Sequence, residues 1–314
     1  MHPGYYNWLF HTTLFADEFY KWGHGIVADL WTTRWQEMKS ITVPVPEYAE
    51  QERIAAFLDA ECAEIDTVLE KTRASIEEYK KLKQAVITQA VTKGIRGDRP
   101  MKNSGIEWIG DIPAEWDVLN LVAHTSMLTP MRDRPENLDG PIPWVRIEDF
   151  EGKYIESSKA GLGVSMKTVK EMNLKVYPVG TILCTSSCIM GKCAIVSREL
   201  VSNQRFIGII PDRTTDKTYL YYLMTSNAER MNFLSTGALQ ANLSRSAFEH
   251  LKVQFPPYSE QQEIAAYLDD KCADIDALVA KKQQYLIEIE NYKKSLIYEY
   301  VTGKKEVKTS VLAD

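Results

Sequence analysis

The sequence is poor in the features that mark secreted and membrane-bound proteins. Its 5 cysteines, at positions 62, 184, 188, 193 and 272, are an odd number without the paired spacing of a secreted disulfide framework. No apolar run approaches the ~18 residues of a membrane span. Residues 1–15 lack the basic stretch and apolar run of a signal peptide. We therefore expect a protein of the reducing cytoplasm without membrane contact.

Motifs for catalysis and metal binding are missing as well. There is no G-x-S-x-G motif and no Walker A motif, because Gly191-Lys192 is followed by Cys193. Gly161-Leu162-Gly163 lacks the third glycine of a dinucleotide fingerprint, and no PD-(D/E)xK nuclease cluster stands out. Cys184, Cys188 and Cys193 are spaced unlike zinc ligands, with no histidine nearby, so we expect them to pack within strands and loops. The sequence predicts a non-catalytic chain without a metal or cofactor of its own.

The charge pattern permits nucleic-acid binding without demanding it. A net charge of −6 argues against a nucleic-acid partner when taken over the whole chain. Residues 151–255, however, hold 13 Lys and Arg against 8 Asp and Glu, whereas residues 101–150 hold 4 against 9. One stretch is therefore locally basic, although no arginine-rich arm occurs.

A repeat at a spacing of 210 residues organises the chain. Residues 41–93 and 251–303 correspond at this spacing, and a repeat of this specificity predicts the same structural element twice. The identical pairs include Tyr48/Tyr258, Glu50/Glu260, Gln51/Gln261, Ile54/Ile264, Leu58/Leu268, Asp59/Asp269, Cys62/Cys272, Asp66/Asp276 and Thr92/Thr302.

Each copy predicts one long amphipathic helix. A proline-containing extended stretch precedes it, apolar residues then recur every three or four positions, and Gly94 or Gly303 closes it. Ser259 and Gln262 form a capping-box pattern in the second copy, whereas Ala49 replaces the serine in the first.

The two apolar stripes match in length and phase. A single helix of this length cannot bury its own stripe, so we expect the two helices to pair as an antiparallel coiled coil of roughly 60 Å. A separate core under each helix is the alternative. Cys62 and Cys272 fall at equivalent positions, and burial is expected for both rather than a redox role.

The stretch between the helices predicts a complete α+β domain over residues 96–255. The expected strands are Asp117–Leu121, Pro143–Glu148, Thr181–Cys184, Cys193–Ser197 and Phe206–Pro211, with one helix over Thr218–Ser235.

Residues 1–44 extend the repeat weakly. Tyr5–Phe10 resembles Tyr219–Met224 with a four-residue offset, so residues 1–44 are expected to be the C-terminal remnant of a first copy of the domain. That copy would lack its N-terminal ~110 residues. Residues 45–95 and 256–305 would then be the long helices, and 306–314 a C-terminal tail.

Polar loops in the α+β region are typical of DNA contacts. Asn and Gln pair with adenine, Arg pairs with guanine, and Ser, Thr and Lys hold phosphates. An ordinary turn is the alternative for each loop taken alone. The candidate DNA-binding residues are Arg132, Arg134, Ser186, Ser187, Lys192, Asn203, Gln204, Arg205, Gln240, Asn242, Ser244 and Arg245.

Several segments together resemble the specificity subunits of type I restriction–modification systems. Pro256–Ala265 is similar to the family's P-P-x-x-E-Q-x-x-I-A start of its long helix, and Val45–Ala55 follows it with Glu47 in place of the second proline. Ser104–Trp116 resembles the S-G-x-x-W-x-G-x-x-P-x-x-W opening of a target recognition domain, and Gly237–Ser244 resembles that domain's exit loop. The resemblance covers essentially the whole chain.

The resemblance implies a non-catalytic protein that reads double-stranded DNA. A recognition domain would read one half of a bipartite target, and the coiled coil would set the unread spacer. The implied partners are methylation subunits, which carry S-adenosylmethionine, and a restriction subunit that uses ATP and Mg. Self-association of two copies is expected if the first recognition domain does not function. The alternative is a coiled-coil scaffold whose α+β domain binds a protein, which predicts no salt-sensitive DNA affinity.

Overall fold

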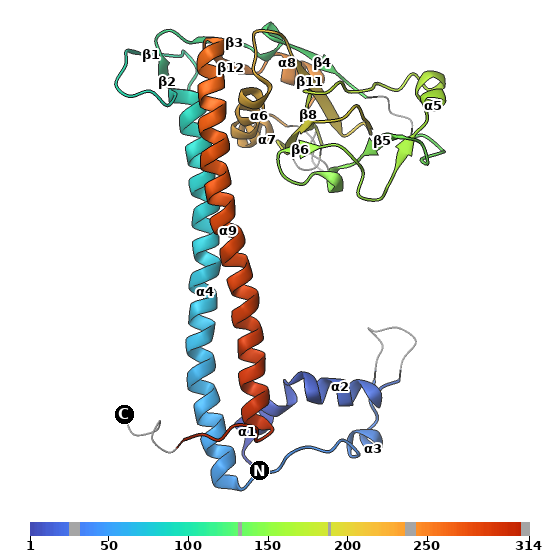
Figure 1. The fold of residues 1–314 in the computed structure, drawn as a ribbon, viewed down its shortest axis with the longest axis vertical. Helices are drawn as coiled ribbons and strands as arrows, with labels where there is room; N and C mark the ends of the chain where they lie inside the picture. The colour runs from blue at the N-terminus through green and yellow to red at the C-terminus, as the bar shows by residue number, and fades with distance from the viewer. Residues whose placement is uncertain (25–31, 131–133, 188–189, 236–242, 309–314) are drawn as a thin grey trace. The chain divides into compact units, whose positions relative to one another are not determined.

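The computed structural model describes residues 1–24, 32–130, 134–187, 190–235 and 243–308 (Figure 1). It divides into two compact units, which we describe separately. Unit 1 comprises Met1–Lys80 and Asp276–Asp314, and unit 2 comprises Lys81–Ile275. The two long helices, α4 (Tyr48–Lys93) and α9 (Tyr258–Val301), contribute to both units.

The ends of the long helices follow the repeat. Gly94 and Gly303 adopt positive φ angles of 74° and 72° directly after the helices, as the sequence predicts for a glycine that ends a helix. The predicted capping box at Ser259 is wrong, because α9 already begins at Tyr258 and Ser259 lies in its first turn. The Gln261 side chain instead donates from Nε2 to the Pro256 carbonyl at 2.9 Å, and Gln51 donates to the Pro46 carbonyl at 2.7 Å.

In each unit the long helices pack antiparallel. Unit 1 buries Leu58 and Leu69 from α4 in one apolar cluster with Leu296 and Val301, which lie at the end of α9. In unit 2, residues 87–91 at the end of α4 share a cluster with residues 264–272 at the start of α9. The predicted pairing is confirmed. Cys62 and Cys272 are buried and outside the disulfide, and their burial was predicted.

The body of unit 2 is built around a five-stranded sheet in the order β4-β11-β8-β9-β6, antiparallel except where β6 pairs with β9. Its strands are β4 (Thr125–Leu128), β11 (Phe206–Pro211), β8 (Ile182–Thr185), β9 (Cys193–Val196) and β6 (Tyr154–Ile155). A three-stranded sheet has the order β10 (Val201–Ser202), β5 (Ile142–Val145) and β7 (Gly163–Val164). Two pairs complete the strands: β1 (Met101–Asn103) with β2 (Asp111–Pro113), and β3 (Asp117–Asn120) with β12 (Lys252–Phe255). The α+β class is confirmed.

Short helices complete the two units. Unit 1 has α1 (Pro3–Phe10), α2 (Thr13–Lys21) and α3 (Trp35–Met38), and unit 2 has α5 (Met166–Glu171), α6 (Lys217–Ser226), α7 (Ala228–Leu234) and α8 (Arg245–Glu249), besides the 3-10 turns Leu121–Ala123 and Ile147–Asp149.

The predicted single helix over Thr218–Ser235 is wrong, because it breaks at Asn227 into α6 and α7. Asn227 ends α6 with its backbone at φ −88° and ψ 7°, and its side-chain amide donates to the Leu223 carbonyl at 2.8 Å. The asparagine amide thus satisfies a helix-end carbonyl, which is the type of local bond that makes this residue favour helix ends over helix interiors.

A buried ionic network joins the domain's opening segment to the start of α9. The Glu260 carboxylate is 1% exposed and accepts from Arg99 Nη1 at 2.6 Å and from Trp116 Nε1 at 3.0 Å. Charged side chains are rarely buried unless paired and hydrogen-bonded, and both conditions are met here. The glutamate of the P-P-x-x-E-Q segment and the last tryptophan of the Ser104–Trp116 segment are therefore direct partners.

Candidate nucleic-acid interface

Three of the predicted polar loops of unit 2 meet at one end of the five-stranded sheet. The Ser186 amide donates to the Arg205 carbonyl at 2.8 Å, and the Ser186 carbonyl accepts from the Leu243 amide at 2.9 Å. Ser186 directly follows β8, Arg205 directly precedes the antiparallel β11, and Leu243 comes just before α8. Segments that are far apart in the sequence are thus fixed next to one another by backbone hydrogen bonds.

The loop before β11 presents two side chains to solvent. Asn203 Oδ1 accepts from the Arg205 amide at 3.0 Å, and this Asx-type turn leaves Gln204 and Arg205 exposed. The neighbouring Ser202 hydroxyl donates to Tyr177 Oη at 3.1 Å, and burial raises the pKa of Tyr177, so the phenol stays neutral. Gln204 and Arg205 therefore point their polar groups to solvent, whereas Asn203 holds the turn.

The β8–β9 hairpin contributes a second exposed cation. Lys192 is exposed, and its amide donates to Thr185 Oγ1 at 3.1 Å across the hairpin. Its ammonium lies 5.9 Å from the centre of the Phe150 ring. Ser187 is buried in the same hairpin and Ser186 is half-buried, so Lys192 is the more accessible of these three candidates.

The candidates near α8 have structural partners already. Ser244 caps the helix by accepting from the Ala247 amide at 3.2 Å, and Arg245 pairs with Glu249 at 2.7 Å. Both residues are exposed, and they directly follow Leu243 in the chain.

Of the four remaining candidates, Arg134 alone lies within the described residues. Arg134 is exposed, and its guanidinium lies 5.7 Å from the centre of the Trp144 ring on β5. Arg132, Gln240 and Asn242 lie outside the described residues.

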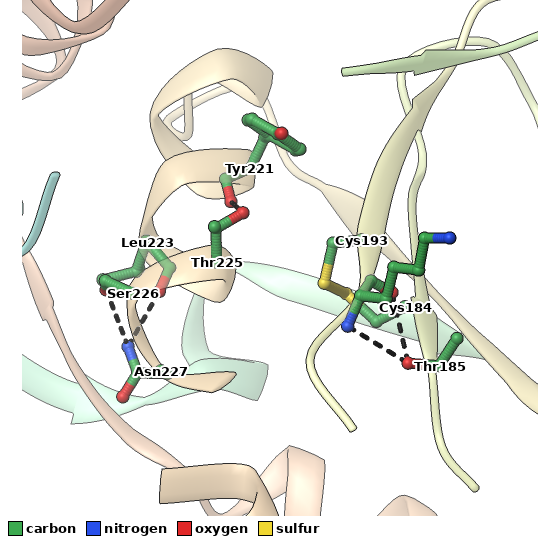
Figure 2. The surroundings of a disulfide bond; sticks show 9 residues. Cys184, Thr185, Cys193, Tyr221, Leu223, Thr225, Ser226 and Asn227 are labelled. Atoms are coloured by element: carbon green, nitrogen blue, oxygen red, sulfur yellow. Dashed lines mark hydrogen bonds between the residues drawn. A yellow bond between two sulfur atoms is a disulfide. The ribbon is translucent and has the colours of Figure 1, made fainter. Parts of the chain in front are cut away.

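A disulfide joins Cys184 and Cys193, which sit opposite each other at the end of the β8–β9 hairpin (Figure 2). Both cysteines are buried within strands, as expected, but the bond between them was not predicted. A signal was present in the sequence, because the predicted strands Thr181–Cys184 and Cys193–Ser197 end and begin at these two cysteines. A hairpin between the strands necessarily places the cysteines face to face.

Two negative observations apply to the described part of the chain. Its His, Cys, Asp and Glu side chains form no group of three able to hold a metal ion. None of its helices is both long enough and apolar enough to cross a membrane.

Comparison with known proteins places these features in one family. The type I restriction modification DNA specificity domain matches residues 117–291, more than half of the chain. The chain belongs to this family, as its resemblance to the family's motifs implies.

Individual relatives agree. The chain is 35% identical over 191 residues to the type I restriction enzyme MjaIX specificity subunit of Methanocaldococcus jannaschii, covering 57% of this chain and 43% of that protein. It is 23% identical over 292 residues to the MjaVIII specificity subunit of the same organism, covering 86% of this chain and 63% of that protein. The chain thus spans between about two fifths and two thirds of the length of these relatives.

Solved structures show the same fold. The HsdS subunit from Thermoanaerobacter tengcongensis matches with a TM-score of 0.56 at 14% identity, over 97% of this chain and 71% of that one. A chain solved in work on the assembly and conformational transition of the type I R-M system matches with a TM-score of 0.77 at 14% identity, over 95% of this chain and 70% of that one.

Proposed function

We propose that this chain is the sequence-specific DNA recognition subunit of a type I restriction–modification complex, and that unit 2 reads one half of a bipartite double-stranded target. The observation that carries the proposal is the junction at Ser186, where backbone bonds to Arg205 and Leu243 unite three polar loops. A reading surface needs several side chains held in fixed register, and these bonds supply that register.

The chemistry of the exposed side chains suits this role. Gln204 can pair bidentately with adenine and Arg205 with guanine in a major groove. Lys192 and Arg245 are placed to neutralise phosphates, and Ser186 and Ser244 offer smaller polar contacts. Arg134, which is exposed beside Trp144, would contact the DNA backbone.

The proposed partners supply the chemistry. Methylation subunits with bound S-adenosylmethionine would modify the recognised site, and a restriction subunit would use ATP and Mg to cut unmodified DNA. This chain would direct both subunits to the site and would carry no cofactor itself. The paired helices α4 and α9 would hold the reader at a fixed spacing from a second half-site.

The second half-site requires a second reader. Residues 1–44 are proposed to be the C-terminal end of a first recognition domain, because α1 docks on α4 as α6 docks on α9. The His2 amide donates to Gln51 Oε1 at 2.8 Å, and the Asp216 amide donates to Gln261 Oε1 at the same distance. If that first domain does not read DNA, two copies of the chain would read the two halves, and the target would be palindromic.

The proposal is tested by selecting duplexes from a random library with the purified full chain. Binding of a selected duplex and of a scrambled duplex is then measured by fluorescence anisotropy across a salt series. We expect enrichment of a sequence motif and affinity that falls steeply with salt, because phosphate contacts release counterions. No enrichment and salt-independent binding would favour the scaffold alternative.

Matched variants locate the reading surface. Arg205→Ala is expected to weaken binding to the selected duplex by about 5- to 100-fold, the discrimination typical of one lost bidentate contact. Lys192→Ala is expected to weaken binding to both duplexes and lower the salt slope by about one unit. Lys71→Ala, which removes an exposed cation of α4 in unit 1, is the control and should change neither.

A further inference from the structure

Only Thr185 separates the Cys184–Cys193 disulfide from Ser186, where the three loops meet. Cys184 and Cys193 are paired across β8 and β9, with their Cα atoms 4.2 Å apart. Ser186, which bonds to both Arg205 and Leu243, follows Cys184 by two residues. The crosslink therefore fixes the base of the hairpin that carries Ser186 and Lys192.

The hairpin is held from other sides as well. The Thr185 amide donates to the Lys192 carbonyl at 2.9 Å, which ties the last residue of β8 to the residue before β9. Gly191 has a positive φ of 76° and packs so closely on α7 that a Cβ there would lie 2.3 Å from the Cβ of Ala228. With one face of the hairpin against α7, the disulfide limits the remaining freedom of its base.

We propose that Cys184 and Cys193 are positioning residues for DNA reading, and that the oxidised pair holds the three-loop junction in its reading geometry. This inference rests on the proposed function. The two sulfurs act without touching DNA, because Cys184 is fully buried and Cys193 is 6% exposed. The pair acts through Ser186, whose backbone bonds place Arg205 and the segment that begins α8.

The proposal makes recognition sensitive to a dithiol reductant. A thiolate of the dithiol attacks one sulfur of the pair, the S–S bond breaks, and the other sulfur leaves as a thiolate and takes up a proton. The second thiol of the reductant then resolves the mixed disulfide. Cys184 and Cys193 end as thiols, and the dithiol ends as a disulfide, with two electrons and two protons transferred.

The bond itself is tested first. The full chain is unfolded without reductant and its thiols are titrated before and after reduction. We expect two fewer thiols before reduction, and trapped peptides that link Cys184 to Cys193. Equal thiol counts in protein purified without reductant would overturn the proposal.

Positioning is tested on the duplex selected with the oxidised chain. Reduced wild type and the Cys184→Ala/Cys193→Ala variant are expected to bind it about tenfold more weakly, the loss of roughly one base contact. Their affinity for scrambled duplex should be unchanged, and re-oxidation of the wild type should restore the specific affinity. Cys62→Ala, which removes a buried thiol of unit 1, should behave as wild type under both conditions.

The outcomes separate the two claims. If the oxidised chain shows no specific binding, the proposed function fails. If it binds specifically and reduction lowers only the melting temperature, the disulfide is structural and the positioning claim is wrong. If the double variant does not fold, reduced wild type carries the same comparison without a substitution.

Discussion

In units 1 and 2, a short helix packs against equivalent residues of a long helix. Trp8 Nε1 of α1 donates to Asp59 at 2.8 Å, and Tyr222 Oη of α6 donates to Asp269, the repeat partner of Asp59, at 2.7 Å. Two different side chains thus meet the same repeated carboxylate. The repeat therefore preserves the position of the acceptor and permits a change of donor.

The buried tyrosines Tyr219 and Tyr5 take part in different hydrogen bonds to the end of a long helix. Tyr219 Oη donates to the Gln254 carbonyl at 3.0 Å, and the Gln254 amide donates to the Val91 carbonyl at 2.7 Å. Proline occupies the position equivalent to Gln254 in unit 1 and has no side-chain amide. There the Tyr5 hydroxyl donates directly to the Val301 carbonyl at 2.7 Å.

The units differ most at the repeated glutamate. Glu260 is buried against Arg99 and Trp116. Glu50, in contrast, is half-buried, and its side chain makes no hydrogen bond or salt bridge with another described residue. Likewise β12 pairs with β3, whereas residues 42–45 form no strand in the described part of unit 1. The repeated segment thus binds a short helix in both units. Among the described residues, it also pairs with a strand in unit 2 alone, through β12 and β3.

The largest expected difference lies at this glutamate. Glu260→Ala should lower the free energy of unfolding by about 3–5 kcal/mol, because the buried Arg99 keeps only the largely exposed Glu115 as counter-charge and Trp116 Nε1 loses its acceptor. Glu50→Ala should change it by about 0.5 kcal/mol or less, as at an ordinary surface site. Urea denaturation followed by circular dichroism measures both, and equal effects would show that the two glutamates are equivalent.

A smaller difference is expected at Gln254 in β12 and at its repeat partner Pro44. Gln254→Ala should cost about 1–3 kcal/mol, because the buried Val91 carbonyl loses its donor. Pro44→Gln should give no comparable gain, since Tyr5 already satisfies the Val301 carbonyl. Thermal denaturation of the two variants checks this pair, and a clear stabilisation by Pro44→Gln would show that the tyrosine bond is a poor substitute.

Alkaline pH should weaken unit 1 through Tyr5. Burial, with the charges of Tyr6 and Glu50, raises the pKa of Tyr5 from 10.0 to about 12. The folded state favours the protonated phenol, so this contribution is complete below pH 10 and is lost as the pH rises toward 12. Stability measured from pH 9 to 11 should fall less in Tyr5→Phe than in wild type, and identical slopes would contradict the assignment.

The smallest effect is expected at an exposed ion pair of the coiled coil. Arg73 and Glu290 lie 2.7 Å apart with both side chains largely exposed. Arg73→Ala should change the free energy of unfolding by about 0.5 kcal/mol or less, because water screens exposed pairs. A larger loss in urea denaturation would indicate a network beyond this pair.

Patterns within a segment were predictable from the sequence. The long helices, their glycine ends and their antiparallel pairing follow from the apolar stripes of the repeat. Strand β11 was predicted with its observed bounds, because its apolar run is buried and is bounded by turns.

Contacts between distant segments were not predictable. The break at Asn227 depends on a side-chain bond to a helix carbonyl, which the apolar pattern does not record. The convergence of Ser186, Arg205 and Leu243 arises from strand order, and composition alone does not give strand order. Sequence reasoning therefore found the polar loops individually without showing that Ser186 joins them.

The most direct test of DNA reading by unit 2 is a map of adenine methylation in cells that co-express this chain with its cognate methylation subunit. We predict methylation at one bipartite motif, lost without this chain, with relaxed specificity within one half-site in the Gln204→Ala/Arg205→Ala variant. An unchanged motif in that variant, or a stable complex that methylates nothing, would contradict the assignment of these loops as the reading surface.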